Sequence, residues 1–179
     1  MNGDAQRPFR RFPFLARMTG AARVHVPTYE EVQLDQAANY QALLVVALGA
    51  AATGSGLGVG LGFLPQYVFL WGAGWLAWVL IIYLLGTTVF RTPGSTAEWG
   101  QLMRTAGFAQ SPAVFQILGI FPVVGTSAHI LLVVVVTVWV LVTMSVAVRL
   151  SFNFSSAWRS AAVVAIGSLP QRFIELLLA

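Results

Sequence analysis

The stretch AHILLVVVVTVWVLVTMSVAV, which runs from Ala128 to Val148, decides the class of fold. Its central part is so rich in β-branched residues that in a water-soluble protein it would predict a buried strand. Such a strand is commonly only about 4–8 residues long, whereas this stretch continues without an acid, an arginine, a glycine or a proline. In lipid, every backbone N–H and C=O must be bonded within the segment, which a helix of about 20 residues achieves. The stretch therefore predicts a membrane-spanning helix.

The composition of the whole chain also indicates an integral membrane protein. Of its 179 residues, 58% are hydrophobic and 9% are charged, and the mean hydropathy is +0.78. A soluble domain carries roughly 25% charged residues, so this chain has too few to cover a water-facing surface. Cysteine is absent, which excludes disulfides and thiolate chemistry. All ten basic residues are arginine, a pattern that we attribute to GC-rich coding and that favours a bacterial source.

Five spans are expected, which makes the fold an all-α membrane bundle. They cover residues 41–64, 67–90, 106–125, 128–148 and 158–179. Pro112 and Pro122 interrupt the third span. The fifth is expected to be kinked or incomplete at Pro170, because Arg172 and Glu175 follow. Residues 1–38 then form a cytoplasmic tail, and residues 39–179 form the transmembrane bundle.

The arginines predict the orientation of the bundle. With the N-terminus in the cytoplasm, the tail, the loop that holds Arg91 and Arg104, and the loop that holds Arg149 and Arg159 all face inward. Only Arg172 is an exception, and the short outer connections carry no charge. Positive residues concentrate on the cytoplasmic side of membrane proteins. The chain is therefore expected in the inner membrane of a bacterium, with its N-terminus inside.

The net charge of +4 does not indicate nucleic-acid binding, because its arginines gather just ahead of the first span. Such a juxtamembrane segment is typical of contact with anionic lipid. Residues 9–23 are expected to lie along the inner leaflet as a basic, amphipathic anchor, with Phe12, Phe14, Leu15 and Met18 buried in it. The arginines assigned to the membrane surface are Arg10, Arg11, Arg17 and Arg23.

Few side chains in the predicted spans could perform chemistry. The first four spans contain no acid, no arginine and one histidine, His129. Coupled transporters place charged or histidine side chains at mid-membrane, and enzymes need positioned acids, bases or nucleophiles. No catalytic residue, metal site or cofactor is therefore predicted, although contact with lipid, quinone or pigment stays open. His129 could ligate a haem or pigment, but we favour a polar residue at the interface.

The repeat GSGLGVGLG, residues Gly54 to Gly62, lacks the G-x-G-x-x-G spacing of a dinucleotide-binding turn. Within the first span, small residues recur every four positions, a pattern that lets helix backbones approach closely. Gly54, Gly58 and Gly62 are therefore predicted as packing positions, as are Gly107 and Pro112 in the third span. The alternative is that the glycines only fray the end of the helix.

Two polar clusters have two interpretations each. Tyr29, Glu30, Glu31 and Asp35 precede the first span. They could dock a partner, or the chain's own arginines Arg91, Arg104 and Arg159, or their carboxylates could simply favour the start of a helix. Gln110, Ser111 and Gln116 follow one another in the third span. They could hydrogen-bond between helices or line a substrate pocket.

Three segments resemble bacterial members of the Yip1 family. The first is RMTGAARVHVPTYEEVQLDQAANYQALLVV (residues 17–46), which has the family's Tyr-Glu-Glu-aliphatic element before the first span. The second is GQLMRTAGFAQSPAVFQILGIFPVVG (residues 100–125), with a Gly-aromatic-Ala-x-x-Pro element. The third is VAVRLSFNFSSAWRSAAVVAIG (residues 146–167), which is similar to the family's basic loop but has Trp158 before Arg159 and Ser160 after it.

The resemblance implies a five-helix membrane protein with a cytoplasmic N-terminus. Eukaryotic members act in vesicle trafficking and bind small GTPases, whereas bacterial members mostly lack a defined activity. It also implies a partner-docking role for Tyr29, Glu30, Glu31, Asp35 and Arg159. The leading hypothesis is a non-enzymatic protein that organises membrane proteins and contacts lipid. The alternative is an accessory transmembrane subunit of a photosynthetic or respiratory complex, which fills a groove or holds lipid, quinone or pigment.

Overall fold

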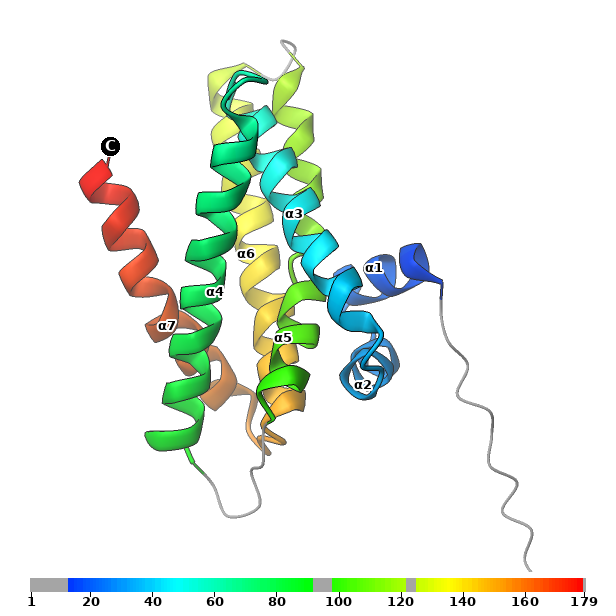
Figure 1. Cartoon of the computed structure of the whole chain (residues 1–179). Coiled ribbons are helices and arrows are strands. Elements are labelled where there is room, and N and C mark those ends of the chain that lie inside the picture. Colours follow the sequence, from blue (N-terminus) through cyan, green and yellow to red (C-terminus); the bar gives the residue numbers. More distant parts are fainter. Residues whose placement is uncertain (1–12, 92–97, 122–124, 179) are drawn as a thin grey trace, which may run out of the picture.

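The computed structural model describes residues 13–91, 98–121 and 125–178, and within these residues it contains helices and turns but no strand (Figure 1). In chain order the helices are α1 (Phe14–Ala22), α2 (Val26–Leu34), α3 (Ala38–Gly56), α4 (Leu64–Thr88), α5 (Trp99–Phe108), the 3-10 helix η1 (Ser111–Ile120), α6 (Thr126–Ser151) and α7 (Ala157–Leu178). The predicted all-helical class is confirmed.

The helices form an upright bundle with a transverse pair on one side. Figure 1 shows α3, α4, α6 and the succession α5–η1 running alongside one another, while α1 and α2 lie across the bundle axis. The C-terminal half of α7 leans away from the other helices. One continuous core of buried side chains joins the transverse pair to the bundle, since Ala21 and Tyr29 belong to the same cluster as Val79 and Met144.

Helices α4 and α6 are long and apolar enough to cross a membrane, judged by length and composition. They have 25 and 26 residues and mean hydropathies of 2.1 and 2.8. Only 22% of the apolar window of α4 and 28% of that of α6 are buried. The core helix of a soluble protein would hide most of its apolar residues. Their large exposed apolar surface therefore fits an environment of lipid.

Helix α3 ends eight residues earlier than the predicted first span. Val59 N–H bonds the Gly54 carbonyl at 2.9 Å and Gly58 N–H bonds the Ser55 carbonyl at 3.0 Å, while Gly58 has a φ of 79°. These features define a Schellman motif, in which a glycine in the left-handed conformation ends the helix. The second half of the glycine repeat is consequently a turn between α3 and α4.

The predicted packing role is wrong for Gly58 and Gly62 as a result. A Cβ atom added at either of them would meet nothing within 4 Å. Gly54 lies within α3, and an added Cβ would come within 2.7 Å of Cδ1 of Tyr67 on α4. The first glycine of the repeat, Gly54, is therefore packed against α4, whereas Gly58 and Gly62 have open space around them.

A seam of small residues joins α3 to α5 and η1. A Cβ added at Gly107 would lie 2.7 Å from Cβ of Ala42, and one added at Gly49 would lie 3.0 Å from Cβ of Ala113. A Cβ at Gly56 would overlap the backbone carbonyl of Gln116. Ala42, Gly49 and Gly56 are seven residues apart, so they follow one face of α3. The four-residue rows of the glycine repeat did not predict this face.

Pro112 is the second residue of η1, just beyond the break that follows α5. Proline has no backbone N–H to bond the carbonyl four residues earlier, which is that of Phe108. The Ser111 hydroxyl donates to this carbonyl instead, at 2.6 Å. The Thr143 hydroxyl of α6 donates to the neighbouring Ala109 carbonyl at 2.7 Å. The break is therefore satisfied by side chains, as the interior of a membrane protein requires.

Substitution of alanine for Gly56 tests the seam. In an open helix this change would add about 1 kcal/mol of stability, but here the new methyl group would collide with the backbone of η1. We expect a loss of about 1–3 kcal/mol, which is typical of overpacking, measured as a lower Tm in detergent. Gly60→Ala is the matched control, because Gly60 has open space around it and the change should be nearly neutral. Equal Tm values for the two variants would contradict the seam.

Candidate functional site

The described residues with the strongest charge interactions lie where the transverse helices meet the bundle. Arg17 of α1 is only 2% exposed. Its Nη2 atom lies 2.6 Å from Oε1 of Glu31 and 2.7 Å from Oδ2 of Asp35, at the two ends of the last turn of α2. Its Nη1 atom donates to Oε1 of Gln41 on α3 at 2.7 Å. We call Arg17, Glu31, Asp35 and Gln41 the Arg17 cluster.

The Arg17 cluster compensates a charge that would otherwise be costly to bury. Burial lowers the pKa of the Arg17 guanidinium, but the hydrogen bonds and charges of Glu31 and Asp35 raise it by more, so the pKa lies above its ordinary value. Arg17 is therefore permanently charged and needs its partners. Removing one partner of a buried ion pair generally costs much more than the net contribution of the intact pair. The cluster thus fixes α2 and α3 against α1.

The carboxyl end of α1 is bonded from two sides. Tyr29 of α2 is fully buried, and its hydroxyl lies within 3.0 Å of the Ala21 carbonyl and 3.4 Å of the Thr143 carbonyl. Burial raises the pKa of the Tyr29 phenol above its ordinary value. Trp139 of α6 donates from Nε1 to the Ala22 carbonyl at 2.7 Å. The last carbonyls of a helix have no partner within it. Trp139 supplies one for Ala22, and Tyr29 adds a second to the Ala21 carbonyl, which also accepts from Val24 N–H at 3.0 Å.

Arg104 of α5 performs the same task at the carboxyl end of α2. Its Nη2 donates to the Gln33 carbonyl at 2.6 Å and its Nε to the Val32 carbonyl at 3.2 Å. Its Nη1 donates to Oδ1 of Asn39 at 3.2 Å. A cation is favourable at this end of a helix because of the helix dipole. Burial lowers the pKa of Arg104, and the charges of Asp35 and Glu98 offset part of this lowering.

These contacts form a clamp, which we define as Arg17, Tyr29, Glu31, Asp35 and Arg104. Each of these side chains bonds another part of the same chain. Within the ranges that the structure describes, no group of three or more His, Cys, Asp or Glu side chains could hold a metal ion. This arrangement holds α1 and α2 rigidly against the bundle.

Only some of the residues predicted to dock a partner are accessible to one. Tyr29, Glu31 and Asp35 face the chain's own helices, and Glu30 is exposed. Arg159 lies apart from them at the start of α7, with its Cζ 6.0 Å from the centroid of the Trp158 ring. Of the three arginines considered as internal partners, Arg104 does reach the acidic element, but through backbone carbonyls rather than carboxylates.

Arg17 corrects the assignment of the tail arginines to the membrane surface. It was grouped with Arg10, Arg11 and Arg23, yet it is buried against two carboxylates. Arg23 is exposed, and Arg10 and Arg11 lie outside the described residues. Phe14 and Met18 of the predicted anchor pack on the core, whereas Leu15 is 71% exposed. The spacing of Glu31 and Asp35, one helical turn apart, was the signal in the sequence that a single cation could bond both.

The remaining candidates lie near the start of α6 and around the break between α5 and η1. His129 is half-buried near the start of α6, and its ring lies close enough to Gly119 that an added Cβ would approach Nδ1 to 2.9 Å. Gln110, Ser111, Pro112 and Gln116 are all buried around the break between α5 and η1. These residues are not part of the clamp.

The protein has two long helices with exposed apolar surfaces, and buried hydrogen bonds and ion pairs hold its N-terminal helices in place. These features define its class as a helical membrane protein with clamped N-terminal helices. The Yip1 domain profile matches residues 26–169, which is most of the chain, and the chain belongs to this family of membrane proteins. No curated protein matches it, and no solved structure does either. The match contains Glu31, Asp35, Tyr29 and Arg104 of the clamp, and Arg17 precedes it.

Replacing Arg17 with methionine should release the transverse helices. Methionine fills similar space but leaves Glu31 and Asp35 without the guanidinium, which should weaken docking by about 3 kcal/mol. That corresponds to a roughly hundredfold faster amide exchange in α1 and α2, measured by hydrogen–deuterium exchange mass spectrometry, with little change in α4 and α6.

The matched control is Arg23→Met, which alters an exposed arginine six residues away and should leave exchange unchanged. Adding Glu31→Gln to Arg17→Met should restore part of the protection, because a neutral amide is cheaper to bury than an unpaired carboxylate. Unaltered exchange in Arg17→Met would show that the cluster does not hold the helices.

Proposed function

We propose that this protein is a non-enzymatic, five-span protein of the bacterial inner membrane that organises other membrane proteins through its clamped N-terminal helices. The observation that carries the proposal is the clamp itself. Three buried charged side chains are used to hold α2 in one position, and this fixes the surface that α2 turns outward. A surface that is ordered in advance loses less conformational entropy when a partner binds.

The outward surface of α2 is suited to protein contact. Val26, Glu30 and Leu34 are each four residues apart and so share one face of the helix. Val26 is 40% exposed, Leu34 is 59% exposed and Glu30 is also exposed. We call these three residues the α2 outer face. Its carboxylate would be repelled by anionic lipid headgroups, which favours a protein as the occupant.

The lengths of the helices support five spans. At about 1.5 Å per residue, the 19 residues of α3 cover about 28 Å and the 22 residues of α7 about 33 Å. From Ala106, where the predicted third span begins, the five residues to Gln110 and the ten 3-10 residues of η1, which rise about 2.0 Å each, cover about 28 Å together. The hydrocarbon core of a bilayer is about 30 Å thick. Each of these elements is therefore within about 3 Å of the thickness that it would have to cross beside α4 and α6.

The proposed orientation predicts the accessibility of cysteines introduced into this cysteine-free chain. Glu98→Cys lies at the exposed start of α5, which would be cytoplasmic, and Thr126→Cys lies at the exposed start of α6, which would be outside. In intact cells an impermeant maleimide should label Thr126→Cys but not Glu98→Cys, and both should be labelled after lysis. Labelling of Glu98→Cys in intact cells would contradict the N-inside orientation.

Site-specific photocrosslinking tests the partner. A benzoylphenylalanine residue in place of Leu34, on the α2 outer face, should form a discrete crosslink to another protein in cells. The same residue in place of Leu131, which is 62% exposed on α6, is the control for non-specific contact within the membrane. The Leu34 crosslink should be weakened at least fivefold in the Arg17→Met background, because α2 would no longer be held in place. Absence of any protein crosslink specific to Leu34 would overturn the scaffolding proposal.

A further inference from the structure

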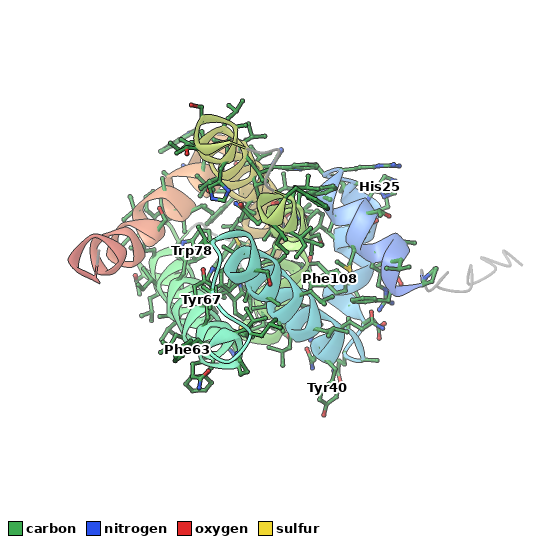
Figure 2. All side chains as sticks on the ribbon, turned by 90° about the horizontal axis from the view of Figure 1, so that it is seen from above. His25, Tyr40, Phe63, Tyr67, Trp78 and Phe108 are labelled. Carbon is green, nitrogen blue, oxygen red and sulfur yellow. The ribbon has the colours of Figure 1, made fainter. Side chains whose placement is uncertain are left out.

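A cavity of about 340 Å³, open on one side, lies between the helices of the bundle. Residues of α3, α4, η1, α6 and α7 line it, so five separate elements of the fold meet there. Figure 2, seen from above, places Tyr67 and Trp78 of α4 toward the interior of the molecule, whereas Phe63 and Tyr40 lie at its periphery. The polar side chains of the lining are Thr53, Tyr67, Gln110, Gln116, Thr137 and Ser168.

Gln110, one of the lining residues, carries an unused hydrogen-bond donor. Its side chain is 1% exposed, and its Nε2 atom has no hydrogen-bond partner among the described residues. A buried amide without a partner destabilises a protein, and such groups are rare in native structures. Gln110 occupies the break between α5 and η1, where Pro112 interrupts the regular helix. The fold thus holds an unsatisfied donor on a residue that lines a partly open cavity.

The rest of the lining indicates what this donor would bond. Tyr67, Trp71 and Trp78 of α4 contribute aromatic rings, and their spacing of four and seven residues puts them on one face of the helix. None of the lining residues is an acid, an arginine or a histidine. The cavity therefore selects an uncharged molecule. Its volume is at the lower end of the range for small-molecule pockets, which is about 300–1,000 Å³.

We propose that this cavity binds an uncharged, mostly apolar molecule that offers a carbonyl oxygen to Nε2 of Gln110. The ester end of a membrane lipid and the ring of an isoprenoid quinone both have this chemistry. An aromatic wall accommodates either an acyl chain or a flat ring, and the amide donor fixes the position of the carbonyl. The cavity is lined by none of the clamp residues and by no residue of the α2 outer face.

Quenching of tryptophan fluorescence provides the test, because Trp71 and Trp78 lie in the wall. The purified full chain in mild detergent would be titrated with tetramethyl-1,4-benzoquinone and, separately, with a phosphatidylcholine brominated in its acyl chain near the ester. We expect saturable quenching by one of these probes. Saturation by the quinone alone identifies a quinone site, and saturation by the brominated lipid alone identifies a lipid site.

Gln110→Leu removes the donor and keeps the size of the side chain. It should weaken the saturable quenching about three- to tenfold, as expected for one lost hydrogen bond, while Tm stays equal or rises because an unsatisfied amide has been removed. Gln36→Leu, at an exposed glutamine, is the matched control and should bind as wild type does. A second variant, Thr137→Phe, should fill the cavity and abolish saturable quenching.

Two results would overturn the proposal. One is the absence of saturable quenching by either probe in the folded wild-type chain. The other is equal affinity in wild type, Gln110→Leu and Thr137→Phe, which would place the probe elsewhere on the protein. Loss of folding in one variant leaves the other variant to decide the question.

Discussion

The close approach of α3 to α5 and η1 is the constraint on which the rest of the bundle depends. Lipid gives helices no hydrophobic reason to associate, so their contact relies on packing and on hydrogen bonds between them. Ala42, Gly49 and Gly56 let the α3 backbone lie against Gly107, Ala113 and the Gln116 carbonyl. That contact sets η1 beside α3 although Pro112 has interrupted the helix, and it places the freed Ala109 carbonyl within reach of Thr143 on α6. Three of the long elements are thereby fixed relative to one another.

The clamp extends this fixed arrangement to the N-terminal helices. An arginine next to a membrane ordinarily finds water or headgroups, but Arg17 is enclosed by Glu31, Asp35 and Gln41. Such an ion pair adds little net stability compared with apolar packing. Its main consequence is that any other placement of α2 would leave a buried charge without its partner, which costs free energy. Arg104 and Tyr29 add the same kind of specificity, because each bonds carbonyls that only one arrangement of the helices brings within reach. The charged groups of this end thus determine position rather than reactivity.

Cavity and clamp make different use of polar groups. In the clamp, the Nη atoms of Arg17 and the donors of Arg104 meet partners on neighbouring helices, whereas Nε of Arg17 has no partner among the described residues. At the cavity, the break at Pro112 brings Gln110 to the wall with a donor that no described residue uses, which suits a small neutral molecule. The two features meet at α6, where Tyr29 of the clamp approaches the Thr143 carbonyl and where Val140 and Leu141 line the cavity.

Three motifs in the sequence indicated the Yip1 family, while hydropathy and the lengths of the apolar segments alone established the all-helical class and the membrane setting of α4 and α6. They do so because lipid requires long apolar segments to satisfy their own backbone groups. The alternating glycines of residues 54–62 fit both a packed helix and a turn, and only the left-handed conformation of Gly58 decided where α3 ends. Likewise the partners of Arg17 are 14, 18 and 24 residues away along the chain. A charge and its partner at such separations are joined only by the crossing of helices, which is a property of the tertiary structure and leaves no periodic trace in the sequence.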